Sequence, residues 1–104
     1  MSKSKTSDSL AERRLADLEA VFSALAHESR RHILLTLHFR GGELGAGDIA
    51  KRFQCSWPTT SRHLKLLVEA ELVTVVKRGR ERIYRLNRER LTGVTGEWLD
   101  WFNS

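Results

Sequence analysis

The stretch AGDIAKRFQCSWPTTSRHLKLLVEAELVTVV, from Ala46 to Val76, decides the fold. Its apolar spacing predicts a short helix from Gly47 to Phe53, which breaks at Gln54-Cys55. A second helix is expected from Ser56 to Ala70, because Ser is a favoured N-cap and Pro58 then falls in the first turn. Two helices joined by a turn of a few residues, the second polar on one side, are typical of a helix-turn-helix.

The expected second helix has an apolar side and a polar side. Its polar side carries small hydroxyls, an indole and cations near its N-terminal end, and such side chains bind base edges in a major groove. An ordinary amphipathic surface helix explains the apolar stripe, but it does not explain why the polar side is small and basic. The predicted DNA contacts on this helix are Ser56, Trp57, Thr59, Ser61, Arg62 and Lys65.

A basic hairpin is expected directly after this helix pair. The runs Leu72–Val76 and Arg82–Leu86 are rich in β-formers and flank Arg78-Gly79. Their alternation predicts that Val73 and Val75 face inward, matched by Tyr84 and Leu86 on the return strand. Arginines on a thin hairpin follow a DNA backbone or enter a narrow minor groove, so Arg78, Arg80 and Arg82 join the predicted DNA contacts.

The net positive charge of the chain comes from this region. The segment from Ser56 to Arg90 holds nine basic and four acidic residues, which accounts for the whole net charge of +5. A charge excess in one segment indicates a surface for a polyanion. A basic hairpin that serves only solubility is the alternative from charge alone.

The flanking segments predict a tail and a dimer interface. Residues 1–8 are expected to be a disordered tail, and residues 9–104 a single domain whose first helix starts at Ser9 with a Ser9/Glu12 capping box. A further helix from Ser29 to Phe39 ends at Gly41-Gly42, and Asn87 caps the last helix. The last helix carries more aromatic surface than a small core usually hides, which is typical of association. The predicted dimer contacts on the first and last helices are Leu15, Leu18, Phe22, Val94, Trp98, Trp101 and Phe102.

Composition limits the other classes of function. A chain of 104 residues with 40% hydrophobic and 30% charged residues is expected to be one globular domain. No apolar run is long enough to span a bilayer and no signal peptide is visible, so we expect a cytoplasmic protein, in agreement with the single Cys55. Enzymatic activity is not expected, because no nucleophile–base pair, phosphate-binding glycine loop or carboxylate pair is visible.

With these pieces in order, the chain from Phe22 to Asn87 resembles the ArsR/SmtB family of winged helix-turn-helix repressors. The matching pieces are Ala24-Leu25-Ala26-His27-Glu28-Ser29-Arg30, Ser61-Arg62-His63-Leu64-Lys65-Leu66-Leu67, and Gly79-Arg80 followed by Tyr84-Arg85-Leu86-Asn87. The resemblance implies a mainly helical fold with a small β-hairpin, in the order α-α-α-α-β-β-α. It also implies a homodimer on the first and last helices, with the Ser56–Ala70 helix bound to a pseudo-palindromic double-stranded DNA operator.

The chain departs from this family at the sensor segment. Many members bind metals through a Glu-Leu-Cys-x-Cys-Asp segment, which here is Glu43-Leu44-Gly45-Ala46-Gly47-Asp48, with glycine at both cysteine positions. A second family site needs Asp and His on the last helix, which has no histidine. His27 and Trp57 also replace residues common in the family. We therefore expect a repressor without a metal or other cofactor; the alternatives are a metal or thiol sensor with unrecognised ligands, and a basic RNA- or protein-binding module.

Overall fold

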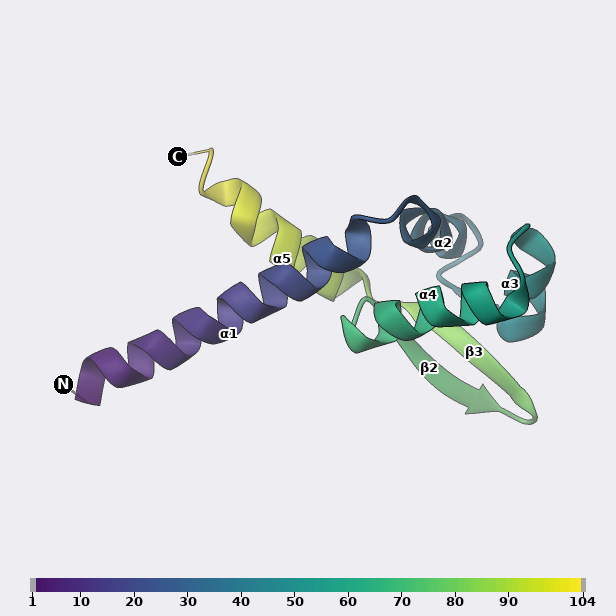
Figure 1. Cartoon of the computed structure of the whole chain (residues 1–104), viewed down its shortest axis with the longest axis horizontal. Coiled ribbons are helices and arrows are strands. Elements are labelled where there is room, and N and C mark those ends of the chain that lie inside the picture. Colours follow the sequence, from purple (N-terminus) through teal and green to yellow (C-terminus); the bar gives the residue numbers. More distant parts are fainter. Residues whose placement is uncertain (1, 104) are drawn as a thin grey trace.

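The computed structural model describes residues 2–103, and the side chains of residues 9–103 among them. Figure 1 shows two helices that project from one end of the molecule and a cluster of shorter elements at the other. The elements along the chain are α1 (Ser2–Leu25), α2 (Glu28–Phe39), β1 (Glu43–Gly45), α3 (Ala46–Arg52), α4 (Trp57–Glu69), β2 (Val73–Arg78), β3 (Glu81–Leu86) and α5 (Arg88–Asp100). The predicted fold class is confirmed. No helix within residues 2–103 is both long and apolar enough to cross a membrane.

The core lies where α2, α3 and α4 meet the sheet and the C-terminal part of α1. Leu37, Ile49, Leu64 and Leu67, one or two from each of these three helices, are at most 1% exposed. These residues belong to the apolar stripes that the sequence shows. Burial of those stripes holds α3 and α4, the two helices of the Ala46–Val76 stretch, together. Val21 of α1 is also fully buried in this core.

The helix ends follow from local chemistry. His27 is the N-cap of α2, and its Nδ1 accepts a hydrogen bond of 3.1 Å from the backbone N–H of Ser29. Gly41 and Gly42 have φ values of 91° and 98°, so they take the left-handed conformation that ends a helix, as predicted. Asn87 caps α5 through a 3.3 Å hydrogen bond from the N–H of Arg90 to its Oδ1, also as predicted.

The sheet has three strands in the order β1-β3-β2, although the sequence predicted only a hairpin. Strand β1 was missed because it is three residues long and one of them is glycine. Val73 and Val75 stand opposite Leu86 and Tyr84, as predicted, but Val75 is 39% exposed. Ile83 and Tyr84 of the central strand β3 are both buried instead. Consecutive strand residues face opposite sides, and only β3 is covered on both.

Helix α1 begins earlier than the sequence indicated. Its helical backbone extends from Ser2, so the predicted start at Ser9 and the Ser9/Glu12 capping box were wrong, because Ser9 lies inside the helix. Residue 1 and the side chains of residues 1–8 lie outside the described part of the chain. The division into a tail of residues 1–8 and a domain of residues 9–104 stays a prediction.

Candidate nucleic-acid interface

Helix α4 presents a polar face at its N-terminal end. Ser56, Trp57, Arg62 and Lys65 are exposed, while Thr59 and Ser61 are half-buried. Ser56 is the N-cap residue, as predicted, but its hydroxyl donates to the hydroxyl of Thr59 at 3.1 Å and caps no backbone N–H. Four of the six predicted contacts on this helix are therefore exposed, and they can reach a neighbouring molecule without any rearrangement of the core.

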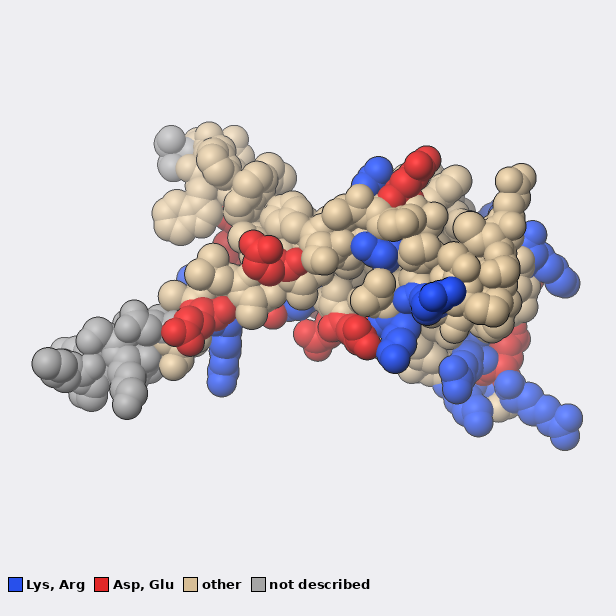
Figure 2. All heavy atoms as spheres, in the orientation of Figure 1, with Lys and Arg blue, Asp and Glu red and all other residues tan. Residues whose placement is uncertain are grey.

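The wing, defined as β2, β3 and the turn Gly79–Arg80 between them, follows α4 directly. Gly79 has a φ of 67°, a conformation that glycine adopts without strain, so it allows the two-residue turn. Arg80 and Arg82 are exposed at the end of the wing. Figure 2 shows that basic side chains gather at the end of the molecule that carries α4 and the wing, whereas acidic and basic residues mix along α1.

Ion pairs divide the nine basic residues of this region into two groups. Glu43 of β1 accepts from Arg78 at 2.9 Å and pairs with Arg85 at 3.2 Å, so it holds two cations of the wing. Arg90 pairs with Asp17 at 3.2 Å and with Glu71 at 3.6 Å. Of these nine, the cations with neither an ion pair nor a histidine contact among the described residues are Arg62, Lys65, Lys77, Arg80 and Arg82. Arg88 has no ion pair there but contacts His38.

Arg78 is thus the predicted DNA contact that the structure places in an internal ion pair. The sequence did not reveal this pair, because Glu43 is 35 residues away and lies on the strand that the sequence missed. The other predicted wing contacts, Arg80 and Arg82, have no such partner among residues 9–103.

Arg30 connects the end of α1 to α4. Its Nε donates to the carbonyl oxygen of Ala24 at 2.7 Å, and its Nη2 donates to that of Ser23 at 3.0 Å. Its Nη1 lies 3.4 Å from Nδ1 of His63 on α4. Arg30 therefore fills the carbonyl positions that α1 leaves unpaired at its C-terminus and contacts the inner side of α4. The sequence does not indicate this role, because these contacts join segments far apart in the chain.

His63 lies in a cluster of basic groups. Its ring packs against that of His27, with 4.5 Å between the centroids. Burial lowers the pKa of His63 below its usual 6.5, and the nearby charges of His27, Arg30 and Arg62 lower it further. The imidazole of His63 is therefore neutral near pH 7.

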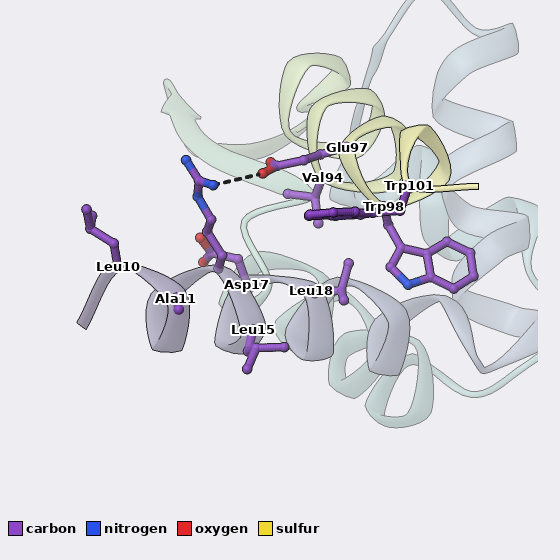
Figure 3. A pocket seen from close by; sticks show the side chains of 10 residues that line it. Leu10, Ala11, Leu15, Asp17, Leu18, Val94, Glu97, Trp98 and Trp101 are labelled. Carbon is purple, nitrogen blue, oxygen red and sulfur yellow. Dashed lines mark ion pairs between the residues drawn. The ribbon is translucent and has the colours of Figure 1, made fainter. Parts of the chain in front are cut away.

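The predicted dimer contacts gather at the opposite end, between α1 and α5. There a cavity of about 480 Å³ is lined mostly by apolar side chains, including Leu10, Leu18, Val94 and Trp98 (Figure 3). A salt bridge of 3.6 Å between Arg14 and Glu97 joins the two helices beside it.

The aromatic residues of this end form a cluster. The ring of Trp98 lies 5.1 Å from Phe22 and 5.0 Å from Phe102, between centroids. Phe22, like Leu18 and Val94, is half-buried within the chain, whereas Leu15, Trp98, Trp101 and Phe102 are exposed.

The segment Glu43–Asp48 holds no thiol. A Cβ at Gly45 would collide with the carboxylate of Glu81, which extends from the wing onto this backbone. Among the described residues, no group of three or more His, Cys, Asp or Glu side chains is arranged to hold a metal ion. Cys55 is exposed in the turn between α3 and α4.

Comparison with known proteins gives one consistent result. A family model described as a helix-turn-helix domain matches residues 25–76. The chain is 44% identical over 88 residues to an arsenical resistance operon repressor of Staphylococcus xylosus, covering 85% of this chain and 82% of that protein. It is 38% identical over 81 residues to the transcriptional repressor SdpR of Bacillus subtilis, covering 78% and 83%.

A solved structure agrees with these relatives. The ArsR-like transcriptional regulator from Rhodococcus sp. RHA1 superposes with a TM-score of 0.72 at 32% identity, over 86% of each chain. The match extends well beyond residues 25–76, so it includes the helices on both sides of the helix-turn-helix.

Proposed function

The chain belongs to the ArsR family of DNA-binding helix-turn-helix transcriptional regulators, and we propose that it acts in the cytoplasm as a homodimeric repressor of a pseudo-palindromic operator. In this proposal, α4 is the recognition helix of each protomer and the wing contacts the flanking DNA. The observation that carries the proposal is the separation of charge: the whole net positive charge comes from residues 56–90, and five cations of α4 and the wing there have no ion pair among the described residues.

The chemistry of α4 and the wing supports distinct roles for them. Arg62 is exposed on α4, and a guanidinium bonds the O6 and N7 atoms of guanine as a pair. Arg80 and Arg82 are on the thin wing, where a cation reaches phosphates or the minor groove. Arg62 is therefore assigned to discrimination between sequences, and the wing arginines to affinity for any DNA.

The shape of the chain supports a dimer. Its Cα radius of gyration is 16.0 Å, whereas a compact domain of this length has about 13 Å. The excess comes from α1 and α5, which project from the core (Figure 1). Trp101 and Phe102 are 76% and 71% exposed. A second copy that covers these aromatics would remove a large apolar surface from water and would place two α4 helices on one DNA face.

Operation without a metal is supported by the glycines of the sensor segment. Gly45 and Gly47 offer no thiolate where related sensors have cysteines, and Glu81 occupies the space beside Gly45. A soft metal ion therefore lacks its ligands at this position. Addition of zinc is expected to leave DNA affinity unchanged, and a zinc-dependent loss of affinity would contradict this part of the proposal.

A gel-shift experiment tests the DNA-binding proposal. In this proposal the operator lies upstream of the protein's own gene, so that DNA is compared with a scrambled duplex of the same composition at one salt concentration. Specific binding is expected to be at least about 10³-fold tighter than non-specific binding. Equal affinity for the two duplexes would refute sequence-specific repression of its own gene. Sedimentation of the free protein tests the dimer in parallel, and a monomer at micromolar concentration would refute that part.

A further inference from the structure

A second cavity, of about 390 Å³, lies between α2, the α3–α4 turn and α4. Its size is within the range of small-molecule sites, which is about 300–1,000 Å³. Ile33 and Phe53 give it an apolar part, while Ser29, Arg52, Gln54 and Thr60 give it hydrogen-bond donors. None of its lining residues is acidic. The cavity is therefore apolar at one side and suited to an anion at the other.

Thr60 is the observation that indicates a ligand. It is 2% exposed, and within residues 9–103 no other polar or charged residue is buried. Its hydroxyl has no hydrogen-bond partner among the described residues. No side-chain oxygen or nitrogen in this part of the chain is both fully buried and without a partner, so the hydroxyl is not fully buried. The hydroxyl therefore keeps a little accessible surface, and Thr60 lines this cavity, so a ligand there can bond to it. Such a ligand would give this nearly buried hydroxyl a hydrogen bond that the protein itself does not supply.

Arg52 supplies the charge. It stands at the C-terminal end of α3 on the rim of the cavity, and it has no ion pair among residues 9–103. A guanidinium binds a carboxylate through two parallel hydrogen bonds, and a hydroxyl donor nearby fits the same group. Phe53 and Ile33 would then pack against the rest of the ligand.

We propose that this cavity binds a small organic carboxylate with an apolar body, and that this ligand lowers the DNA affinity of α4. The second half rests on the proposed function. Thr60 and His63 line the cavity from the inner side of α4, and Arg62 lies between them on the exposed side. A ligand wedged against the inner side displaces the outer side, because packed helices move as rigid bodies.

Benzoate is the probe for the first half, followed by amide chemical shifts of the ¹⁵N-labelled protein without DNA. Saturable shifts are expected at Ser29 and across the segment from Arg52 to Thr60, with none from equimolar benzyl alcohol. Arg52→Ala and Thr60→Val should each weaken benzoate binding about tenfold, which is the loss of one good polar contact. Thr60→Val breaks no hydrogen bond in the free protein, and Arg52→Ala removes an exposed side chain. Both variants are therefore expected to fold, and either one tests the site. Arg40→Ala, an exposed arginine outside the cavity, is the control and should bind like the wild type.

The result without DNA decides the site. Absence of saturable shifts, shifts located elsewhere, or equal binding by the Arg52 and Thr60 variants would overturn it. Equal competition by sulfate would also overturn it, because the cavity would then be a general anion site that a DNA phosphate could fill.

Gel shifts with and without benzoate decide the regulatory half. At saturation, benzoate should weaken operator binding by at least about fivefold for the wild type and Arg40→Ala, which is the lower range of allosteric coupling. Benzoate should leave the operator affinity of Arg52→Ala unchanged. An equal concentration of acetate serves as the control for ionic strength. Specific binding without a benzoate response overturns the regulation alone, whereas no specific binding in the absence of benzoate overturns the proposed function and leaves the site to the chemical-shift result.

Discussion

Replacement of Arg80 by alanine tests the division of the wing cations into paired and unpaired groups. Arg80 is exposed at the turn of the wing, without an ion pair among the described residues. Arg85, on the same wing, is held by Glu43 at 3.2 Å and is the matched control, since Arg85→Ala removes the same charge. A cation that DNA must first take from an internal carboxylate contributes less to binding than an unpaired cation. The two variants should therefore differ in the salt dependence of DNA binding.

The expected size follows from counterion release. Each phosphate that a protein neutralises contributes about −0.9 to the slope of log affinity against log salt. The five unpaired cations on α4 and the wing of each protomer give ten in a dimer, so the wild-type slope is about −9 and affinity falls roughly 10⁵-fold between 50 and 200 mM salt. Arg80→Ala removes two contacts from the dimer, so its slope should be about −7. Arg85→Ala should remain close to the wild-type slope.

Fluorescence anisotropy on a labelled operator, repeated over that range of salt, measures the slopes directly. The Arg80→Ala protein should also lose affinity equally for operator and scrambled DNA, because phosphate contacts carry no sequence information. Equal slopes for Arg80→Ala and Arg85→Ala would refute the division into paired and unpaired cations. A loss confined to the operator would show that Arg80 contacts bases.

Three other predictions concern α4, the dimer interface and the basic cluster. Arg62→Ala should reduce discrimination between operator and mismatched sites by roughly 1–3 kcal/mol in the same anisotropy assay. Trp98→Ala should weaken the dimer by about 2 kcal/mol or more in sedimentation, as loss of a central aromatic contact does, while Leu35→Ala, an exposed apolar residue of α2, should leave it unchanged. The lowered pKa of His63 means that the unfolded chain binds a proton more readily, so stability is full above pH 6.5 and falls as the pH drops below it. In urea titrations, His63→Gln should reduce this loss of stability at acidic pH. A loss as large as in the wild type would contradict the role of His63.

The helix-turn-helix and the wing could be predicted from the sequence because their signals are local. The stripe of Leu64 and Leu67, the N-cap position of Ser56 and the glycine of the wing turn each act within a few residues of the chain. The sequence predicted less well which residues of the wing are buried. Val75 follows the alternation but is exposed, since the cover over a strand depends on elements elsewhere in the chain.

The contacts that decide which cations are available could not be predicted in this way. Glu43 pairs with Arg78 and Arg85 only because β1 joins the far edge of the sheet, in register with β3. No spacing in the sequence indicates that pairing. A charge count over Ser56–Arg90 therefore located the basic region correctly but overstated the number of cations that are free to bind a phosphate.

The same kind of long-range contact connects the two ends of the molecule. Arg30 joins the carbonyl oxygens at the end of α1 to His63 on α4. Arg90 of α5 donates to the carbonyl oxygen of Ala70, at the C-cap of α4, at 3.1 Å and pairs with Asp17 of α1. Helix α4 is thus tied to α1 through two arginines, in its middle and at its C-terminal end. In the proposed dimer, the position of α1 therefore sets the separation of the two recognition helices, and a displacement of α4 by a ligand works against these two attachments.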